Sequence, residues 1–101
     1  MTKAHPLFLE VASQLRELAC GGETDWCLSD HAIEEMLNDH LELPDIVYAI
    51  QHGKIVRGKL DGDCWNYVVE GKTTDGFRIA MPVSFSTEEK YIDIITVWRI
   101  H

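Results

Sequence analysis

The chain has 101 residues, of which 46% are hydrophobic and 26% are charged, and its formal net charge at pH 7 is −8. This length provides one modest hydrophobic core and is too short for a second, and the composition excludes a disordered or low-complexity chain. No apolar run approaches the ~20 residues that a membrane helix needs, and the first residues lack the pattern of a secretory signal, so we expect a cytoplasmic protein with no membrane partner.

The negative charge is distributed unevenly along the chain. Residues 1–53 contain ten acidic and two basic side chains, whereas residues 54–101 contain seven of each. Because an acidic surface repels phosphate groups, the first half is not expected to bind nucleic acid. The neutral second half can still present a local basic face.

Apolar residues at intervals of three and four predict helices in the first half of the chain. The predicted helices cover residues 5–19, 30–39 and 44–52. Gly21 follows the first helix, as glycine commonly does. Ser29 can accept a hydrogen bond from a free amide at the start of the second helix, and Pro44 suits the first turn of the third. Between the first two helices, a short extended piece is expected around Trp26.

The short helices must be held by packing, so each needs a buried stripe. In the second helix the predicted stripe is Ala32, Ile33, Met36 and Leu37, and in the third it is Ile46, Val47, Ala49 and Ile50.

The second half alternates apolar and polar residues as strands do. Strands are predicted over residues 54–60, 65–72, 77–85 and 91–100, with Asp-Gly turns at 61–63 and 74–76. Pro82 has no amide donor, so its strand is expected to be an edge there or to be bulged. The predicted fold is one α+β domain, with short helices packed on one face of a mainly antiparallel four-stranded sheet.

Alternation also predicts which side chains share a face of this sheet. In the last strand it groups Arg99 with Asp93 and Tyr91, and it places Trp98 on the opposite face with Ile92 and Ile94. If the helices cover the more apolar face, the cations predicted to gather on the other are Arg57, Lys59, Arg78 and Arg99. Such a patch is a candidate RNA surface. The alternative is that these are solvated strand residues that pair with Glu70 and Asp93.

The remaining polar and aromatic residues give weaker signals. Cys20, Cys27 and Cys64 are an odd number without a Cys-x-x-Cys pair, so free thiols are favoured over a zinc site made by Cys27, His31 and His40. No metal and no cofactor is predicted. The three tryptophans, Trp26, Trp65 and Trp98, are either base-stacking platforms or, as the simpler interpretation, pieces of the core.

Several short motifs occur in a characteristic order. They are His31-Ala32 at a helix start, Met36, Asp45-Ile46-Val47, Gly53-Lys54-Ile55, Gly71, Gly76 and Ile95-Thr96-Val97-Trp98-Arg99. In this order and spacing the chain resembles the family called domain of unknown function 4258, within the RelE/ParE-like (MqsR-like) toxin superfamily. The resemblance covers residues 27–100 as a family-like core of the single domain, with residues 1–22 as an N-terminal helical extension.

The resemblance implies a RelE-like fold and a toxin-like component of a bacterial type II toxin–antitoxin pair. Its partners would be an antitoxin of zinc-finger or helix-turn-helix type and RNA, and its activity would be messenger-RNA cleavage. Cleavage needs a general acid or base and a cation on the phosphate, and only His31 and Arg99 carry over as catalytic residues. For His31 the simpler interpretation is a helix-capping or surface histidine.

Acidic and amide side chains surround Met36 where the family favours arginine. They are Glu34, Glu35, Asn38 and Asp39. A carboxylate there would repel the scissile phosphate. The alternative function is therefore a non-catalytic protein-interaction module of the same fold.

Overall fold

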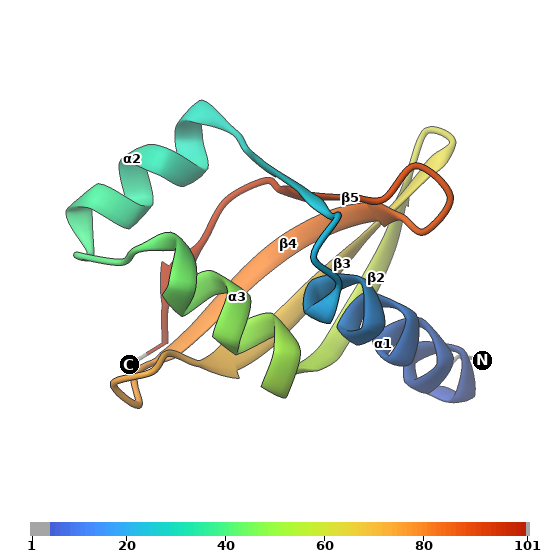
Figure 1. Cartoon of the computed structure of the whole chain (residues 1–101), viewed down its shortest axis with the longest axis horizontal. Coiled ribbons are helices and arrows are strands. Elements are labelled where there is room, and N and C mark those ends of the chain that lie inside the picture. The colour runs from blue at the N-terminus through green and yellow to red at the C-terminus, as the bar shows by residue number, and fades with distance from the viewer. Residues whose placement is uncertain (1–4, 101) are drawn as a thin grey trace.

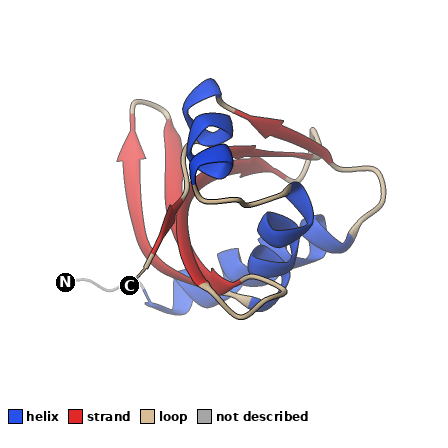
Figure 2. Ribbon diagram, turned by 90° about the vertical axis from the view of Figure 1, so that its left-hand side faces the viewer, coloured by secondary structure: helices blue, strands red, loops and turns tan. Residues whose placement is uncertain are grey.

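The computed structural model describes residues 5–100. It is a mixed α+β structure with three helices and one sheet, in which the helices lie on the same side of the sheet (Figures 1 and 2). The elements in chain order are α1 His5–Cys20, β1 Asp25–Leu28, α2 Asp30–Asn38, α3 Leu43–His52, β2 Lys54–Asp61, β3 Cys64–Lys72, β4 Arg78–Ser86, β5 Tyr91–Ile94 and β6 Trp98–Arg99.

The sheet has six strands rather than the four predicted. Its order is β1-β5-β4-β3-β2, and β6 pairs with β4 beyond the end of β5. The pair of β1 and β5 is parallel, and the other four strand pairs are antiparallel. The two extra strands arise because the extended piece around Trp26 joins the sheet and because the predicted strand 91–100 is interrupted at residues 95–97.

Pro82 explains why the interruption is tolerated inside the sheet. β4 is an interior strand, so Pro82 does not lie on an edge strand. Its carbonyl accepts a hydrogen bond from the Ile95 amide at 3.0 Å. In an antiparallel strand the amide and carbonyl of one residue face the same neighbour, so the missing donor of Pro82 faces the gap between β5 and β6.

The core lies between the helices and the inner face of the sheet. Its most deeply buried side chains are Ile46 from α3, Ile79, Met81 and Val83 from β4, Ile92 and Ile94 from β5, Val69 from β3, and Val97. Helix α1 belongs to the same core, because Leu15, Leu18 and Ala19 are part of this cluster.

The predicted stripe of α2 is only half right. Ala32 and Met36 are buried, but Ile33 is 43% and Leu37 is 71% exposed. Helix α2 lies at one end of the molecule and contacts β1 (Figure 1). The stripe of α3 is buried as predicted at Ile46, Ala49 and Ile50, and Val47 is half-buried.

The predicted turns and cap are confirmed. Gly62 and Gly76 have φ angles of 64° and 89° in the β2–β3 and β3–β4 turns, the region that favours glycine. The Ser29 hydroxyl accepts a hydrogen bond from the Ala32 amide at 3.0 Å. It also donates one to the carbonyl of Ile95 at 2.5 Å, which ties the start of α2 to the interruption after β5.

Candidate functional site

The face of the sheet away from the helices carries most of the cations of the second half. We call Lys54, Arg57, Lys59, Lys72 and Arg78 the sheet-face cations; all five are exposed. Alternation sets Lys54, Lys72 and Arg78 opposite to the inward-facing residues of their strands, which are Ile55, Val69 and Ile79. A register shift between Ile55 and Arg57 then places Arg57 and Lys59 on the same outer face. The predicted grouping of Arg57, Lys59 and Arg78 on this face is therefore confirmed by the register, and the strands add Lys54 and Lys72.

The register shows how closely these cations are set. Lys72 lies opposite Arg78, Arg57 opposite Val68, and Lys59 opposite Asn66. Opposed residues in an antiparallel pair have Cβ atoms about 4.5–5.5 Å apart. The Lys72–Arg78 pair thus sets two like charges side by side, an arrangement that an anion would stabilise.

Glu70 is the acidic residue that forms an ion pair with one of them. Its carboxylate lies 3.5 Å from Arg78 Nη2, and the Glu70 and Arg78 side chains are 30% and 58% exposed. Lys54 is opposite Glu70 in the register. Within residues 5–100 the other ion pair joins Lys90 to Glu23, so Lys54, Arg57, Lys59 and Lys72 form none. The alternative interpretation of paired strand residues holds for Arg78 and Glu70, and Asp93 is in no ion pair of the described residues.

An aromatic side chain completes this face. Trp98 lies opposite Ala80 on β4 and is 39% exposed. It lines a hollow of about 430 Å³ with Val56, Arg57, Val68, Glu70, Ala80 and Ile100. An exposed indole beside a cation can stack a nucleobase while the cation holds the phosphate. Trp98 is therefore not the core piece that the simpler interpretation expects, and Trp65 is also 45% exposed.

Arg99 lies on the opposite side of the sheet from the sheet-face cations. It is paired with Ile79, whose side chain faces the core. The interruption at residues 95–97 shifts the alternation, so the prediction that Arg99 shares a face with Asp93 is wrong. Its guanidinium instead lies over the Phe77 ring, 4.1 Å from the centroid, where a cation–π contact holds it.

His31 and Arg99 are not brought together by an observed interaction. His31 is exposed on the first turn of α2. Neither side chain takes part in a side-chain hydrogen bond or an ion pair within residues 5–100. The capping role belongs to Ser29 and not to His31.

Other parts of the described chain offer less chemistry. Cys27, His31 and His40 do not form a ligand set, because no cluster of three His, Cys, Asp or Glu side chains within residues 5–100 could hold a metal ion. Burial raises the pKa of the Tyr67 phenol, and this partly buried side chain packs against the core. No helix in the described part of the chain is long and apolar enough to cross a membrane.

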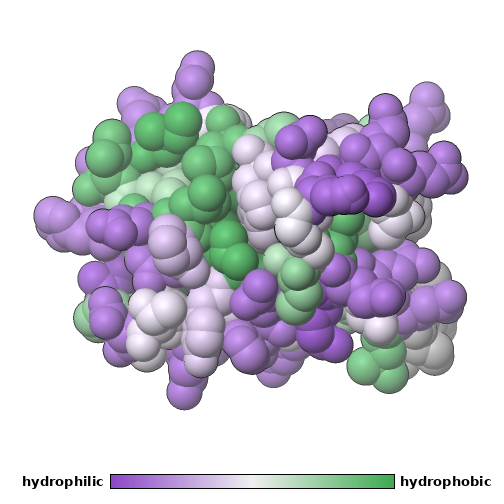
Figure 3. All heavy atoms as spheres, in the orientation of Figure 1, coloured by the Kyte–Doolittle hydropathy of each residue, from purple (hydrophilic) through white to green (hydrophobic). Residues whose placement is uncertain are grey.

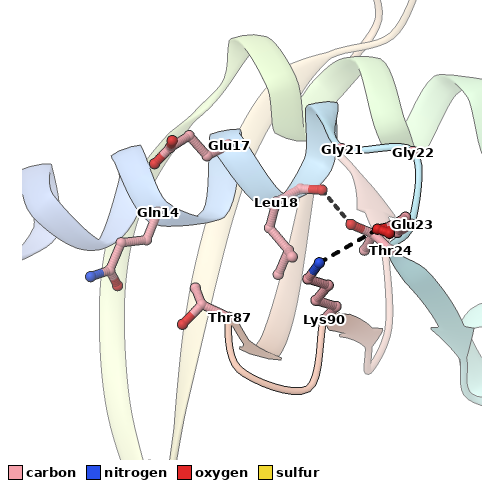
Figure 4. Close-up of a pocket in the computed structure, with 9 residues that line it drawn as sticks. All are labelled: Gln14, Glu17, Leu18, Gly21, Gly22, Glu23, Thr24, Thr87 and Lys90. Atoms are coloured by element: carbon pink, nitrogen blue, oxygen red, sulfur yellow. Dashed lines mark hydrogen bonds and ion pairs between the residues drawn. The ribbon is translucent and has the colours of Figure 1, made fainter.

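A hollow of about 490 Å³ lies between the end of α1 and the loop before β5 (Figure 4). Within it, Lys90 lies 3.6 Å from Glu23, and the Thr24 hydroxyl donates to the Leu18 carbonyl at 2.6 Å. Its lining contains none of the predicted site residues, and its lysine is already paired. The sheet face is therefore the better candidate.

Comparison with known sequences places this arrangement in a family. The sequence model of Domain of unknown function (DUF4258) matches residues 28–99. The chain belongs to this family. No curated protein and no solved structure matches it. The DUF4258 match includes α2, α3, all five sheet-face cations, His31 and Arg99, whereas α1 lies outside it.

Lys54 and Lys72 are the members of the DUF4258 sheet face that sequence reasoning missed. Both follow from alternation, since Lys54 precedes the apolar Ile55 and Lys72 lies three residues after Val69. Each stands at a strand end, where the boundary of the element is hardest to predict and alternation is the weakest signal.

Proposed function

We propose that this protein is the toxin-like component of a bacterial type II toxin–antitoxin pair and that its sheet face holds RNA. One observation carries this function: in a chain of net charge −8, five exposed cations lie on the face of the sheet that the helices leave open. The order of motifs that resembles the RelE/ParE-like toxins supports the same role.

The chemistry of this face suits single-stranded RNA. Each lysine or arginine that approaches a phosphate releases bound counterions and thereby favours binding. Trp98 offers a stacking surface beside Arg57, and stacking does not depend on which base is present. The acidic helical half would keep RNA away from the rest of the molecule.

Cleavage is a separate step that His31 and Arg99 would serve as proposed catalytic residues. A ribonuclease of this kind activates the 2′-hydroxyl with a general base and stabilises the charge on the phosphorus with a cation. Arg99 lies at the sheet margin over Phe77 and His31 lies on α2. The proposed function therefore rests on RNA binding by the sheet face. Cleavage would require the bound RNA to extend around β6 to reach Arg99.

Induced expression in a bacterial host tests the proposed role. The wild-type protein should arrest growth, and the double variant Arg57→Glu/Lys59→Glu should relieve the arrest. Arg16→Glu is the matched control, because it reverses an exposed charge on α1, away from the sheet face. His31→Ala and Arg99→Ala should also relieve the arrest, since losing a general acid–base group costs about 10²–10⁴ in rate. Harmless expression of folded wild-type protein would contradict the toxin role.

A non-catalytic protein-interaction module is the second candidate, and the charge of the helical half favours it. Residues 1–53 carry the whole net charge of −8. A basic partner should then associate quickly at low salt and more slowly as the Debye length falls from about 10 Å at 0.1 M to about 3 Å at 1 M. An association rate that does not change with salt would reject this candidate.

A further inference from the structure

A cleft lies where the end of α3 meets one end of the sheet. Its volume is about 400 Å³, and its lining comes from four successive elements. The lining residues are Tyr48, His52, Gly53, Lys54, Glu70, Gly71, Lys72 and Arg78. Three of the sheet-face cations therefore also line this cleft, which Arg57 and Lys59 do not.

Two glycines bring the walls of this cleft together. A Cβ atom at Gly53 or at Gly71 would lie less than 3.0 Å from the carbonyl oxygen of Ala49 in α3. Because the obstructing atom belongs to the backbone, it cannot rotate away as a side chain would. Glycine at both positions allows the last turn of α3 to lie against the end of β3, which sets Tyr48 and His52 beside Lys54 and Lys72.

The charge in this cleft fits a dianion. Lys54, Lys72 and Arg78 supply three positive charges, and Glu70 removes one, without counting His52. Glu70 is 3.5 Å from Arg78, but Lys54 and Lys72 form no ion pair within residues 5–100. A phosphomonoester carries a charge of about −1.5 to −2 at pH 7, which matches the excess of two positive charges better than the single charge of a phosphodiester does.

An aromatic pair forms the other wall. The rings of Tyr48 and His52 lie 4.4 Å apart between centroids and are inclined by 43°. Tyr48 is 40% exposed, so its ring has free surface on which a nucleobase can stack. A phosphate site beside a stacking surface is the combination that recognises a nucleotide.

We propose that this cleft binds a nucleoside monophosphate group, with Lys54, Lys72 and Arg78 on the phosphate and Tyr48 against the base. The group can be the terminal nucleotide of an RNA or a free nucleotide. As a site for an RNA end the cleft rests on the proposed RNA binding, and as a site for a free nucleotide it does not.

The first experiment compares labelled RNA oligonucleotides that differ only at their ends, with hydroxyls at both ends, a 5′-phosphate or a 3′-phosphate. Wild-type protein should bind one phosphorylated form at least about tenfold more tightly, since hydrogen bonds to a charged group are the stronger kind. Lys54→Ala/Lys72→Ala should abolish the preference. Lys59→Ala is the matched control on the same face. It should weaken the binding of all three RNAs equally and leave the preference for the phosphorylated end unchanged.

The second experiment titrates adenosine 5′-monophosphate and ribose 5-phosphate, without RNA, into the wild-type protein and into Tyr48→Ala. Both ligands should shift the backbone amide resonances of Gly53 and Gly71 in NMR spectra. Tyr48→Ala should weaken binding of the nucleotide about tenfold and leave ribose 5-phosphate unchanged.

The outcomes separate this inference from the proposed function. A preference for a terminal phosphate that depends on Lys54 and Lys72 supports the cleft as a site for an RNA end. Nucleotide binding without any RNA binding supports the cleft as a free-nucleotide site and rejects the proposed function. RNA binding with no end preference, together with no response to either small ligand, contradicts the proposal that the cleft binds a nucleotide. The proposed function would then still stand.

Discussion

The carbonyl oxygen of Ala49 lies less than 3.0 Å from the position that a Cβ atom at residue 71 would take, so α3 and β3 are in backbone contact at Gly71. This contact fixes the end of α3 on the sheet. It also determines the position of the Tyr48 side of the cleft relative to Lys72.

Gly71→Ala should therefore destabilise the protein. Overpacking of this kind costs about 1–3 kcal/mol in the free energy of unfolding, which urea or thermal denaturation would measure. Gly22→Ala is the matched control, because a Cβ atom there has no neighbour within 4 Å, and its stability should be unchanged or slightly higher. Equal stability of the two variants would show that α3 does not approach β3 this closely.

Ser29→Ala should detach the start of α2 from the end of β5. The hydroxyl both caps the helix at the Ala32 amide and donates to the Ile95 carbonyl, so the expected decrease is about 1–2 kcal/mol in the free energy of unfolding. Ser13→Ala, on the exposed side of α1, should have almost no effect. A decrease no greater than that of Ser13→Ala would contradict the capping geometry.

The stability of the folded state should fall at high pH through Tyr67. Burial raises the pKa of its phenol in the folded protein, so the folded state holds the proton more firmly than the unfolded state does. Its contribution is fully present below the unfolded pKa of about 10 and disappears as the pH rises through the folded pKa. Denaturant titrations across this range should show a steeper decline for wild type than for Tyr67→Phe. Equal declines in stability for the two proteins would contradict a raised pKa of Tyr67 in the folded state.

Much of the fold could be predicted from local patterns in the sequence. The three helices, the Asp-Gly turns and the strands 54–61, 64–72 and 78–86 follow from periodicity and turn chemistry, which depend on neighbours in the chain. Family membership also follows from motifs such as His31-Ala32 and Gly53-Lys54-Ile55, within the matched residues 28–99.

Non-local relationships could not be predicted in the same way. The parallel pairing of β1 with β5 depends on a contact between residues more than sixty apart. The interruption at residues 95–97 moves Arg99 to the other face of the sheet, and it depends on Pro82 in a different strand. One shifted residue reverses every side chain that follows, which explains why alternation places Arg78 on the correct face and Arg99 on the wrong one. The register shift between Ile55 and Arg57 likewise turns Arg57 and Lys59 away from the face of Ile55.

The exposure of two apolar side chains on α2 could not be predicted either. Ile33 and Leu37 have the spacing of a buried stripe, yet they are 43% and 71% exposed. Figure 3 shows hydrophobic surface over this end of the molecule. Periodicity tells which residues share a helix face but not how far the sheet extends beneath it.

The most direct test of RNA binding by the sheet face is a titration of labelled single-stranded RNA with hydroxyls at both ends, at several salt concentrations. Wild-type protein should bind with a dissociation constant of roughly micromolar or tighter at low salt and more weakly as salt rises. Arg57→Glu/Lys59→Glu should abolish binding or lower the salt slope by about 0.7 for each phosphate that the variant no longer neutralises, and Arg16→Glu should change neither. Absence of wild-type binding at low salt, or equal binding by Arg57→Glu/Lys59→Glu and Arg16→Glu, would contradict RNA recognition by this face.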